Sequence, residues 1–194
     1  MPENSPQRLA LFGGTFDPVH NGHLELVEAA FRVCNVDRVI FVPCAQSPFK
    51  SGQATRANAE ERFEMIENAL AAREWGESRA TVSRFEIDRP PPSYSWETAA
   101  QFSDLESDAD WHWIVGTDQW EEIERWANPD ILRELLTFIV VTRDGDEIEE
   151  RDGWRHIPVP FEHPASATAI REGRGKPEWI PEPNREMVAR IYGA

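Results

Sequence analysis

Short apolar runs alternate along this chain with segments whose apolar residues recur every three or four positions. Residues 9–12 are apolar throughout and run into Gly13-Gly14, a pattern typical of a buried strand that ends in a turn. From Gly22 onward, apolar residues follow the spacing of one face of a helix. The same alternation predicts further strands at 38–43, 81–85, 111–115, 136–142 and 154–159, and further helices at 60–73, 95–105, 118–126, from 129 onward, 167–172 and 184–192.

Polar residues and prolines mark several of the expected helix ends. Ser95 is a candidate N-cap for the helix at 95–105, because its hydroxyl can accept a hydrogen bond from a free backbone N–H. Asn128 followed by Pro129 predicts another helix start, with asparagine as the cap and proline at the first helical position. Three prolines at 90–92 predict a stiff loop after the strand at 81–85.

Strands that alternate with helices predict a parallel sheet with right-handed crossovers and helices on both faces. We therefore expect a doubly wound α/β fold of Rossmann-like type, built as a single domain over residues 1–194 with a small helical part at about 166–194. In such folds ligands bind at the carboxyl ends of the strands. Residues 12–13, 42–43 and 115–116 are three such ends, so we expect the site where they converge.

The connection between the first strand and the first helix carries two histidines, His20 and His23. Because Gly13 and Gly14 lack side chains, backbone N–H groups there can approach an anion closely. A helix start favours negative charge through its free N–H groups and its dipole. Residues three apart on a helix are neighbours, so both imidazoles can face one ligand and donate to phosphate oxygens. The pattern indicates nucleotide-phosphate binding coupled to phosphoryl-group transfer.

A pair of histidines three residues apart can also be half of a metal site. No His-Glu-x-x-His sequence occurs, and no cysteine or carboxylate at ligand spacing completes such a set. Two further signatures are missing from the sequence. Gly175-Lys176 is followed by Pro177, where a P-loop needs serine or threonine, and the Gly-x-Ser-x-Gly sequence of serine hydrolases does not occur.

Composition narrows the class of protein further. With 194 residues, 40% hydrophobic residues and eight tryptophans, the chain is long and apolar enough for a packed core. A net charge of −15 argues against a general binder of nucleic acid or of acidic membranes. Phosphate binding by so acidic a protein requires a local positive pocket. The candidate contributors are His20, His23, Lys50, Arg143 and Arg171.

Neither a secretory signal nor a membrane span is expected from the sequence. Residues 1–8 are polar, and no run of about 18 apolar residues occurs. Cys34 and Cys44 are interpreted as reduced thiols in or near the core of a cytoplasmic protein. The sequence leaves open whether the chain forms a homo-oligomer.

Residues 12–23, Phe-Gly-Gly-Thr-Phe-Asp-Pro-Val-His-Asn-Gly-His, resemble the signature of the HxGH nucleotidyltransferase superfamily, and within it the bacterial nicotinate mononucleotide adenylyltransferases. Later landmarks similar to that family follow in its order, at 42–43 with 47–50, 93–98, 113–118, Trp126 and 166–171. The departures are Phe49 in place of the usual histidine, Pro164-Ala165 before the last motif, and a somewhat short segment after Arg171. They bear on substrate choice more than on reaction class.

This resemblance implies a nucleotidyltransferase fold and transfer of the adenylyl group of ATP to nicotinate mononucleotide. The attacking group would be the phosphate of the mononucleotide, so the protein would supply positioning and charge stabilisation but no nucleophile. Mg²⁺ would be carried with ATP and bound mainly by phosphates and water, so no protein metal ligands are assigned. The two nucleotides would be the partners of the chain, with no nucleic acid and no membrane among them.

Residue roles follow from the positions that match the family motifs. The catalytic residues would be His20, His23 and Arg171. ATP and its phosphates would be bound by Gly13, Gly14, Thr15, Phe16, Lys50, Ser166 and Thr168. Nicotinate mononucleotide would be bound by Ser95, Asp118, Trp126 and Ala127.

Several alternatives stay open at this point. Arg171 could be a surface cation, Asp118 a helix N-cap and Trp126 a packing residue. The acceptor could be nicotinamide mononucleotide or phosphopantetheine, and a non-catalytic paralogue could bind nucleotides as a sensor. The remaining histidines lie outside the motifs and are expected to be structural. They are His112, His156 and His163.

Overall fold

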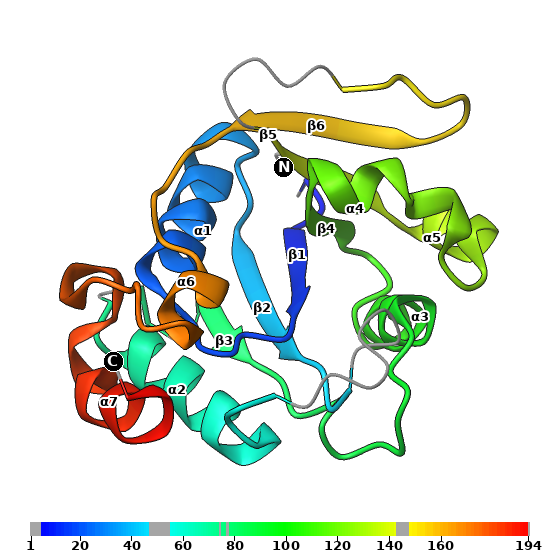
Figure 1. Cartoon of the computed structure of the whole chain (residues 1–194). Helices are drawn as coiled ribbons and strands as arrows, with labels where there is room; N and C mark the ends of the chain where they lie inside the picture. The colour runs from blue at the N-terminus through cyan, green and yellow to red at the C-terminus, as the bar shows by residue number, and fades with distance from the viewer. Residues whose placement is uncertain (1–4, 47–54, 74, 77, 143–147, 194) are drawn as a thin grey trace.

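A six-stranded parallel sheet lies at the centre of the protein in this computed structural model, which describes residues 5–46, 55–73, 75–76, 78–142 and 148–193 (Figure 1). The strand order is β3-β2-β1-β4-β5-β6. The strands are β1 (Arg8–Gly14), β2 (Arg38–Pro43), β3 (Ala80–Val82), β4 (Asp110–Gly116), β5 (Thr137–Thr142) and β6 (Arg155–Pro160). Every neighbouring pair is parallel, as predicted.

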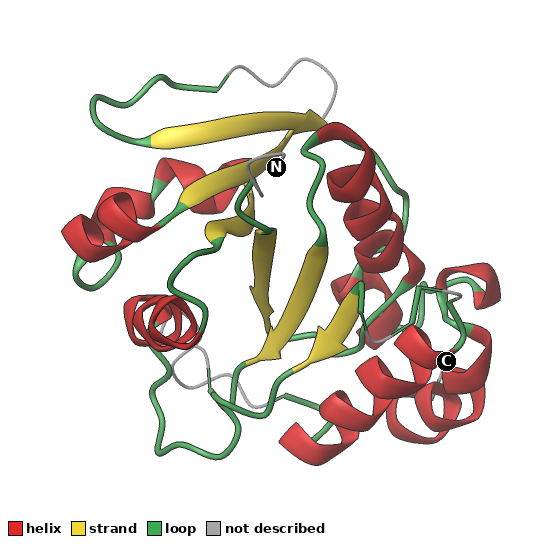
Figure 2. Cartoon of the chain, turned by 180° about the vertical axis from the view of Figure 1, so that it is seen from behind, coloured by secondary structure: helices red, strands yellow, loops and turns green. Residues whose placement is uncertain are grey.

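Helices cover both faces of this sheet, which confirms the doubly wound α/β fold (Figures 1 and 2). Helices α1 (Asn21–Val33), α2 (Ala59–Ala71), α6 (Ala167–Arg171) and α7 (Arg185–Tyr192) lie on one side. Helices α3 (Ser95–Leu105), α4 (Thr117–Glu121) and α5 (Pro129–Leu135) lie on the other. Short 3₁₀ turns occupy Ile123–Arg125, Pro177–Trp179 and Glu182–Asn184.

Strand β1 is buried on both of its faces, as the central strand of such a sheet must be. Ala10 and Phe12 belong to the apolar cluster under α1 and α2, whereas Leu9 and Leu11 belong to the cluster under α3 to α5. On either side of β1 lie β2 and β4, so the strand order changes direction here. A doubly wound sheet opens a crevice at this position, and ligands bind there.

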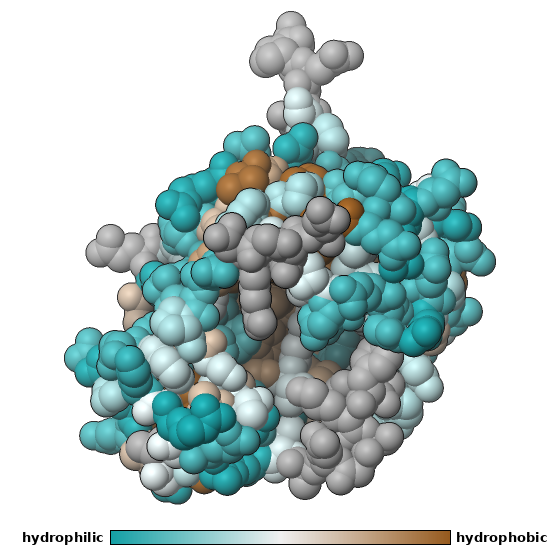
Figure 3. Space-filling view, turned by 45° about the horizontal axis from the view of Figure 1, so that its top comes forward, coloured by the Kyte–Doolittle hydropathy of each residue, from teal (hydrophilic) through white to brown (hydrophobic). Residues whose placement is uncertain are grey.

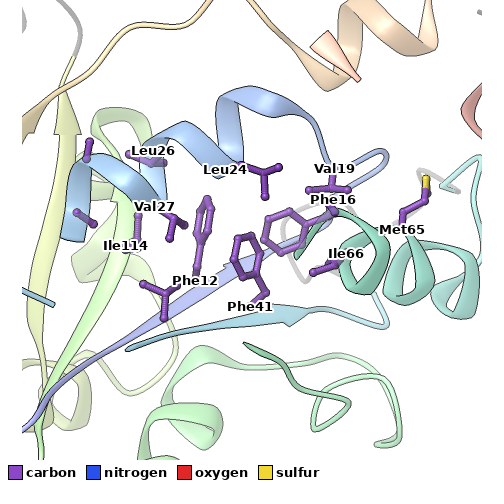
Figure 4. Packing of buried hydrophobic residues seen from close by; sticks show 14 of the residues in the cluster. Phe12, Phe16, Val19, Leu24, Leu26, Val27, Phe41, Met65, Ile66 and Ile114 are labelled. Atoms are coloured by element: carbon purple, nitrogen blue, oxygen red, sulfur yellow. The ribbon is translucent and has the colours of Figure 1, made fainter. Parts of the chain in front are cut away.

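Aromatic side chains pack between the β1–α1 connection and the sheet (Figure 4). The ring of Phe16 lies 5.3 Å from that of Phe12 and 5.6 Å from that of Phe41. Phe16 has a φ of +50°, a left-handed conformation that costs a side chain of this kind about 1–3 kcal/mol. Its ring is only 4% exposed, and burial of a phenylalanine contributes about 1.5–3 kcal/mol, enough to offset that cost.

Four local expectations need correction. The strand expected at 81–85 ends at Val82, because the Ser83 hydroxyl accepts from the N–H of Phe85 and starts a turn. Ser95 is the first helical residue of α3 rather than its cap, a position taken by Tyr94. The helix expected at 118–126 is split into α4 and a 3₁₀ turn. Asn128 precedes Pro129 as expected, but in a left-handed conformation and without a capping hydrogen bond from its side chain.

The face of the molecule seen in Figure 3 is largely hydrophilic and is hollowed near the middle of the view. Within the described part of the chain, no helix is both long and apolar enough to cross a membrane. Cys34 and Cys44 are buried and form no disulfide within the described residues, as predicted.

Candidate active site

Gly13 and Gly14 end β1 where neighbouring side chains leave no room for a Cβ atom. A Cβ on Gly13 would lie 2.7 Å from the indole of Trp113, and one on Gly14 would lie 2.9 Å from the ring of Phe16. Real Cβ atoms do not approach other atoms so closely. The two glycines therefore let the β1–α1 connection pass close over the sheet.

His20 and His23 stack on each other at the start of α1. Their ring centroids are 3.7 Å apart and their planes differ by 22°. The backbone N–H of His20 donates to Nδ1 of His23 at 3.1 Å. Since that Nδ1 accepts, a neutral His23 carries its proton on Nε2. His23 thus has a fixed tautomer and a free N–H donor.

Burial keeps both rings neutral in the ligand-free protein. It lowers the pKa of His20 from 6.5 to about 4, with a further contribution from the charge of His163. It also lowers the pKa of His23 well below 6.5, with contributions from the charges of His20 and His163. Nδ1 of His20 is buried and has no hydrogen-bond partner in the described part of the chain.

A cleft of about 860 Å³ opens beside these histidines, between the start of α1, the end of β4 and residues 161–166. It brings together four of the predicted site residues, although they come from three separate segments. These are His20, His23, Asp118 and Ser166.

Asp118 lies in the first turn of α4, and its carboxylate folds back over the end of β4. A Cβ on Gly116 would lie 2.7 Å from Oδ1 of Asp118, so the glycine makes this conformation accessible. The side chain reaches the cleft opposite the two histidines. It is therefore placed where a carboxylate can accept from ligand hydroxyls.

His163 also lines the cleft, although its position outside the motifs led us to expect a structural role. Its Nδ1 accepts from the N–H of Ala165 at 3.0 Å, and its Nε2 lies 3.6 Å from Oε1 of Glu25. A Cβ on Gly22 would lie 2.9 Å from Nδ1 of His163 and 3.1 Å from Nδ1 of His20. The imidazole thus packs directly over the glycine that separates the predicted histidines.

Arg171 and Thr168 lie on helix α6, directly after the cleft residue Ser166, but neither is among the residues that line the cleft. Arg171 donates to the carbonyl of Asp17 at 2.7 Å and to the hydroxyl of Thr168 at 3.1 Å. Ser166 caps the helix by accepting from the N–H of Ala169. The last predicted motif is thereby attached to the β1–α1 connection, about 150 residues away in the chain (154 between Asp17 and Arg171).

Asp17 anchors the same connection through a buried carboxylate, a role that the sequence analysis missed. It accepts from the N–H groups of Arg56 and Ala57 and, at 2.6 Å, from the hydroxyl of Tyr192 in α7. Burial and the adjacent carboxylate raise the pKa of Tyr192, so this hydroxyl stays protonated and donates.

Arg62 of α2 is a second anchor that the sequence analysis missed. It donates to the carbonyl oxygens of Thr15 and Cys44, at 2.7 and 2.8 Å. One signal was available in the sequence. Arg62 falls on the helix face of Met65, Ile66 and Ala69, where an apolar residue would be usual.

The residues expected to bind the mononucleotide, Asp118 excepted, lie outside the lining of this cleft. Trp126 is 7% exposed and meets Trp113 edge to face at 6.4 Å. Ala127 is exposed, and Ser95, at the first position of α3, is partly buried. Lys50 and Arg143, two of the expected cations, lie outside the described residues.

Comparisons with known proteins agree with this arrangement. The profile of a family described as cytidylyltransferase-like matches residues 11–173. A relative from Methylacidiphilum infernorum, named a probable nicotinate-nucleotide adenylyltransferase, is 39% identical over 166 residues, 85% of this chain and 79% of the relative. A relative of the same name from Thermus thermophilus is 37% identical over 184 residues, 90% and 92% of the two chains.

The fold is also found among solved structures. Plasmodium falciparum nicotinic acid mononucleotide adenylyltransferase complexed with NaAD superposes with a TM-score of 0.74 over 96% of both chains, at 13% sequence identity. At that identity the likeness concerns the fold, and it extends over nearly the whole chain.

Proposed function

Because this chain belongs to the cytidylyltransferase-like family, we propose that it transfers the adenylyl group of ATP to nicotinate mononucleotide. The products are nicotinate adenine dinucleotide and pyrophosphate, and the reaction is a step in NAD biosynthesis. Relatives that are 35–39% identical to this chain over the aligned residues are named probable nicotinate-nucleotide adenylyltransferases. The single observation that carries the proposal is the stacked pair His20–His23 at the start of α1, facing the cleft.

The pair is suited to hold phosphate oxygens. Nε2 of His23 is a donor of fixed tautomer, and the first N–H groups of α1 add partial positive charge. Anions raise the pKa of a nearby imidazole, so a bound triphosphate favours protonation of both rings. We propose that they stabilise the negative charge that develops during transfer.

The chemistry needs no nucleophile from the protein. A phosphate oxygen of nicotinate mononucleotide attacks the α-phosphorus of ATP, and a new P–O bond forms. The bond between the α-phosphorus and the α,β-bridging oxygen breaks, and pyrophosphate leaves with the electron pair. Mg²⁺ carried with ATP would be held mainly by the phosphates and water, and it would offset part of the phosphate charge.

The remaining predicted residues complete the proposed site. Thr168 and Arg171 would turn from each other and from Asp17 to hold the β- and γ-phosphates. Asp118 would accept from a ribose hydroxyl, and Trp126 would stack on the pyridine ring. Backbone N–H groups at Ser95 and Ala127 would meet the pyridine carboxylate, which favours the acid over the amide.

The first test is pyrophosphate release by the purified protein with Mg-ATP and each of three acceptors. Nicotinate mononucleotide should support the fastest release, ahead of nicotinamide mononucleotide and phosphopantetheine. Faster release with another acceptor would support adenylyl transfer but contradict nicotinate mononucleotide as the acceptor. A protein that binds ATP but releases no pyrophosphate with any of the three would be a nucleotide sensor.

The role of the histidine pair has a test of its own. His23→Ala should lower kcat by about a hundredfold, because it removes a preorganised donor to developing charge. Asn21→Ala is the matched control, since Asn21 lies in the same turn and donates to the carbonyl of Glu178 instead. A folded His23→Ala protein with near-normal turnover would exclude the assigned role.

A further inference from the structure

Arg62 is a buried arginine whose side chain ends beneath the loops that follow β1 and β2. It is 1% exposed, among the most buried side chains of the protein. Nη1 donates to the carbonyl of Thr15 at 2.7 Å, and Nη2 donates to the carbonyl of Cys44 at 2.8 Å. Thr15 follows β1 and Cys44 follows β2, so one guanidinium joins the carboxyl ends of two adjacent strands.

Arg62 forms no ion pair with a carboxylate of the described residues. Its hydrogen-bond partners are neutral backbone carbonyls, and its Nε has no partner within the described part of the chain. Taking a cation out of water is unfavourable unless hydrogen bonds compensate for the lost hydration, and here backbone carbonyls accept from it. The guanidinium therefore keeps a positive charge in the interior, bound to the backbone of both loops.

The hydrogen bond to Thr15 has a consequence for the backbone above it. The C=O of Thr15 and the N–H of Phe16 belong to one planar peptide unit and point in opposite directions. With the carbonyl held by Arg62, the N–H of Phe16 is turned away from α2. Phe16 also has a φ of +50°, so this peptide is held in a conformation that the chain would not adopt unaided.

We propose that Arg62 is a positioning residue for the adenylyl transfer. It fixes the Thr15–Phe16 peptide so that its N–H faces the triphosphate, and it supplies positive charge beneath the phosphate site of a protein whose net charge is −15. This inference rests on the proposed function, because it assumes that a triphosphate occupies the β1–α1 connection. The proposal also explains why Arg62 is buried, because it would act on the phosphates through the Thr15–Phe16 peptide and through its charge, without touching them.

Two substitutions separate this role from a purely structural one. Arg62→Met keeps the volume and removes the charge and both hydrogen bonds, so the affinity for ATP should fall at least about tenfold. Its thermal midpoint should fall, because the carbonyl oxygens of Thr15 and Cys44 lose their donors, so ATP affinity is measured where the variant is still fully folded. Arg62→Lys keeps the charge but cannot span both carbonyls, so its ATP affinity should lie between the two.

The measurements are ATP binding by calorimetry, KM and kcat in the pyrophosphate assay, and thermal midpoints. Arg133→Met, a half-exposed arginine on α5 paired with Asp130, is the control and should match the wild type in all three. Normal ATP affinity in a folded Arg62→Met protein would overturn the inference. If Arg62→Met does not fold, normal ATP affinity in Arg62→Lys would also overturn it, since the two-loop hydrogen bonding is lost there.

Failure of the inference can be told from failure of the proposed function. The wild-type protein alone tests the function, through pyrophosphate release with nicotinate mononucleotide. ATP affinity of the variants requires no acceptor, so it tests Arg62 whichever acceptor the enzyme uses. An affinity that falls equally in Arg62→Met and Arg133→Met would reflect loss of net positive charge only and would contradict a positional role.

Discussion

Two imidazoles approach Gly22, which has no side chain to separate them. His20 and His163 both approach the position that a Cβ of residue 22 would take, at 3.1 and 2.9 Å. The glycine between the two motif histidines therefore has a packing function in addition to its backbone freedom. It lets a segment 140 residues further along the chain close against the start of α1.

Gly22→Ala should displace these rings and lower kcat/KM for ATP by about ten- to a hundredfold, because catalytic groups act only within narrow geometric limits. Stability should change little, since alanine is the better helix former and offsets part of the crowding. Steady-state kinetics and thermal denaturation measure the two effects. The double variant Gly22→Ala/His163→Ala should recover part of the activity, and no recovery would show that His163 is not the group displaced.

The neutral state of His20 makes stability depend on pH. The unfolded chain binds a proton with a pKa of 6.5 and the folded protein with a pKa of about 4, so between these values the unfolded state holds more protons. The contribution of His20 to the free energy of unfolding is fully present above pH 6.5 and is lost as the pH falls toward 4. Between pH 7 and 4.5, the free energy of unfolding should therefore fall by about 2 kcal/mol less in His20→Gln than in the wild type. Urea denaturation without nucleotide measures it, and identical losses in the two proteins would contradict the lowered pKa of His20.

Sequence reasoning found the residues of the cleft that belong to a local pattern. His20 and His23 share one helical turn, and Asp118 and Ser166 follow recognisable segments, so their meeting at the sheet edge could be expected. His163 could not be found in this way, because its contacts depend on how distant elements pack. Arg62 is marked in the sequence by its place on an apolar helix face, but that signal does not show which carbonyls it binds.

At the scale of elements, α7 and the β1–α1 connection act as one unit. Tyr192 reaches across from α7 to Asp17, whose carboxylate also receives two backbone N–H groups from the segment before α2. Three separate segments thus converge on one buried carboxylate that lies three residues before His20. The position of the histidine turn depends on helices that contribute nothing to the chemistry.

Tyr192→Phe should lower the free energy of unfolding by about 1–3 kcal/mol, because it removes one donor from a buried carboxylate. Tyr94→Phe provides a matched control, since Tyr94 is the other tyrosine of the chain and is 37% exposed. Chemical denaturation of the two variants measures the difference. Equal stabilities would show that the hydroxyl contributes nothing to anchoring Asp17.

Element types were predictable, but some of their ends were not. Apolar runs identified the central strands because their neighbours bury them, and β2 begins and ends where expected. The end of β3 depends on a hydrogen bond from Phe85 to the Ser83 side chain. The cap of α3 depends on backbone geometry at Tyr94, since no side-chain hydrogen bond marks it. Such details are set by single local contacts, which an apolar pattern does not record.

The whole molecule repels its proposed substrates at long range. With a net charge of −15, it meets two anionic nucleotides, and its local positive groups act only near the cleft. The overall fold was predictable because the alternation of strands and helices extends along the chain and allows few topologies. The distribution of charge could not be predicted from the sequence, because it depends on which of the 20 basic residues the fold buries or pairs.

Added salt should therefore raise the rate at which ATP reaches the site, because it screens the long-range repulsion. We expect kcat/KM for ATP to rise about two- to threefold between 10 and 150 mM of an inert salt, at fixed free Mg²⁺. An enzyme whose adenine-nucleotide site is surrounded by positive charge would instead show a lower kcat/KM for ATP as salt is added. A monotonic decrease would mean that the local positive groups dominate the approach of ATP as well as its binding.

The hydrogen bond between Asp17 and Tyr192 joins residues that are 175 positions apart. On the ribosome, the histidine turn emerges early, whereas the hydroxyl that anchors it emerges only after about 170 further residues have been added. Domains fold as their segments become available. A nascent chain that stops before Tyr192 thus carries both histidines but lacks the contact that fixes their turn, so the turn reaches its full stability only once Tyr192 has been synthesised.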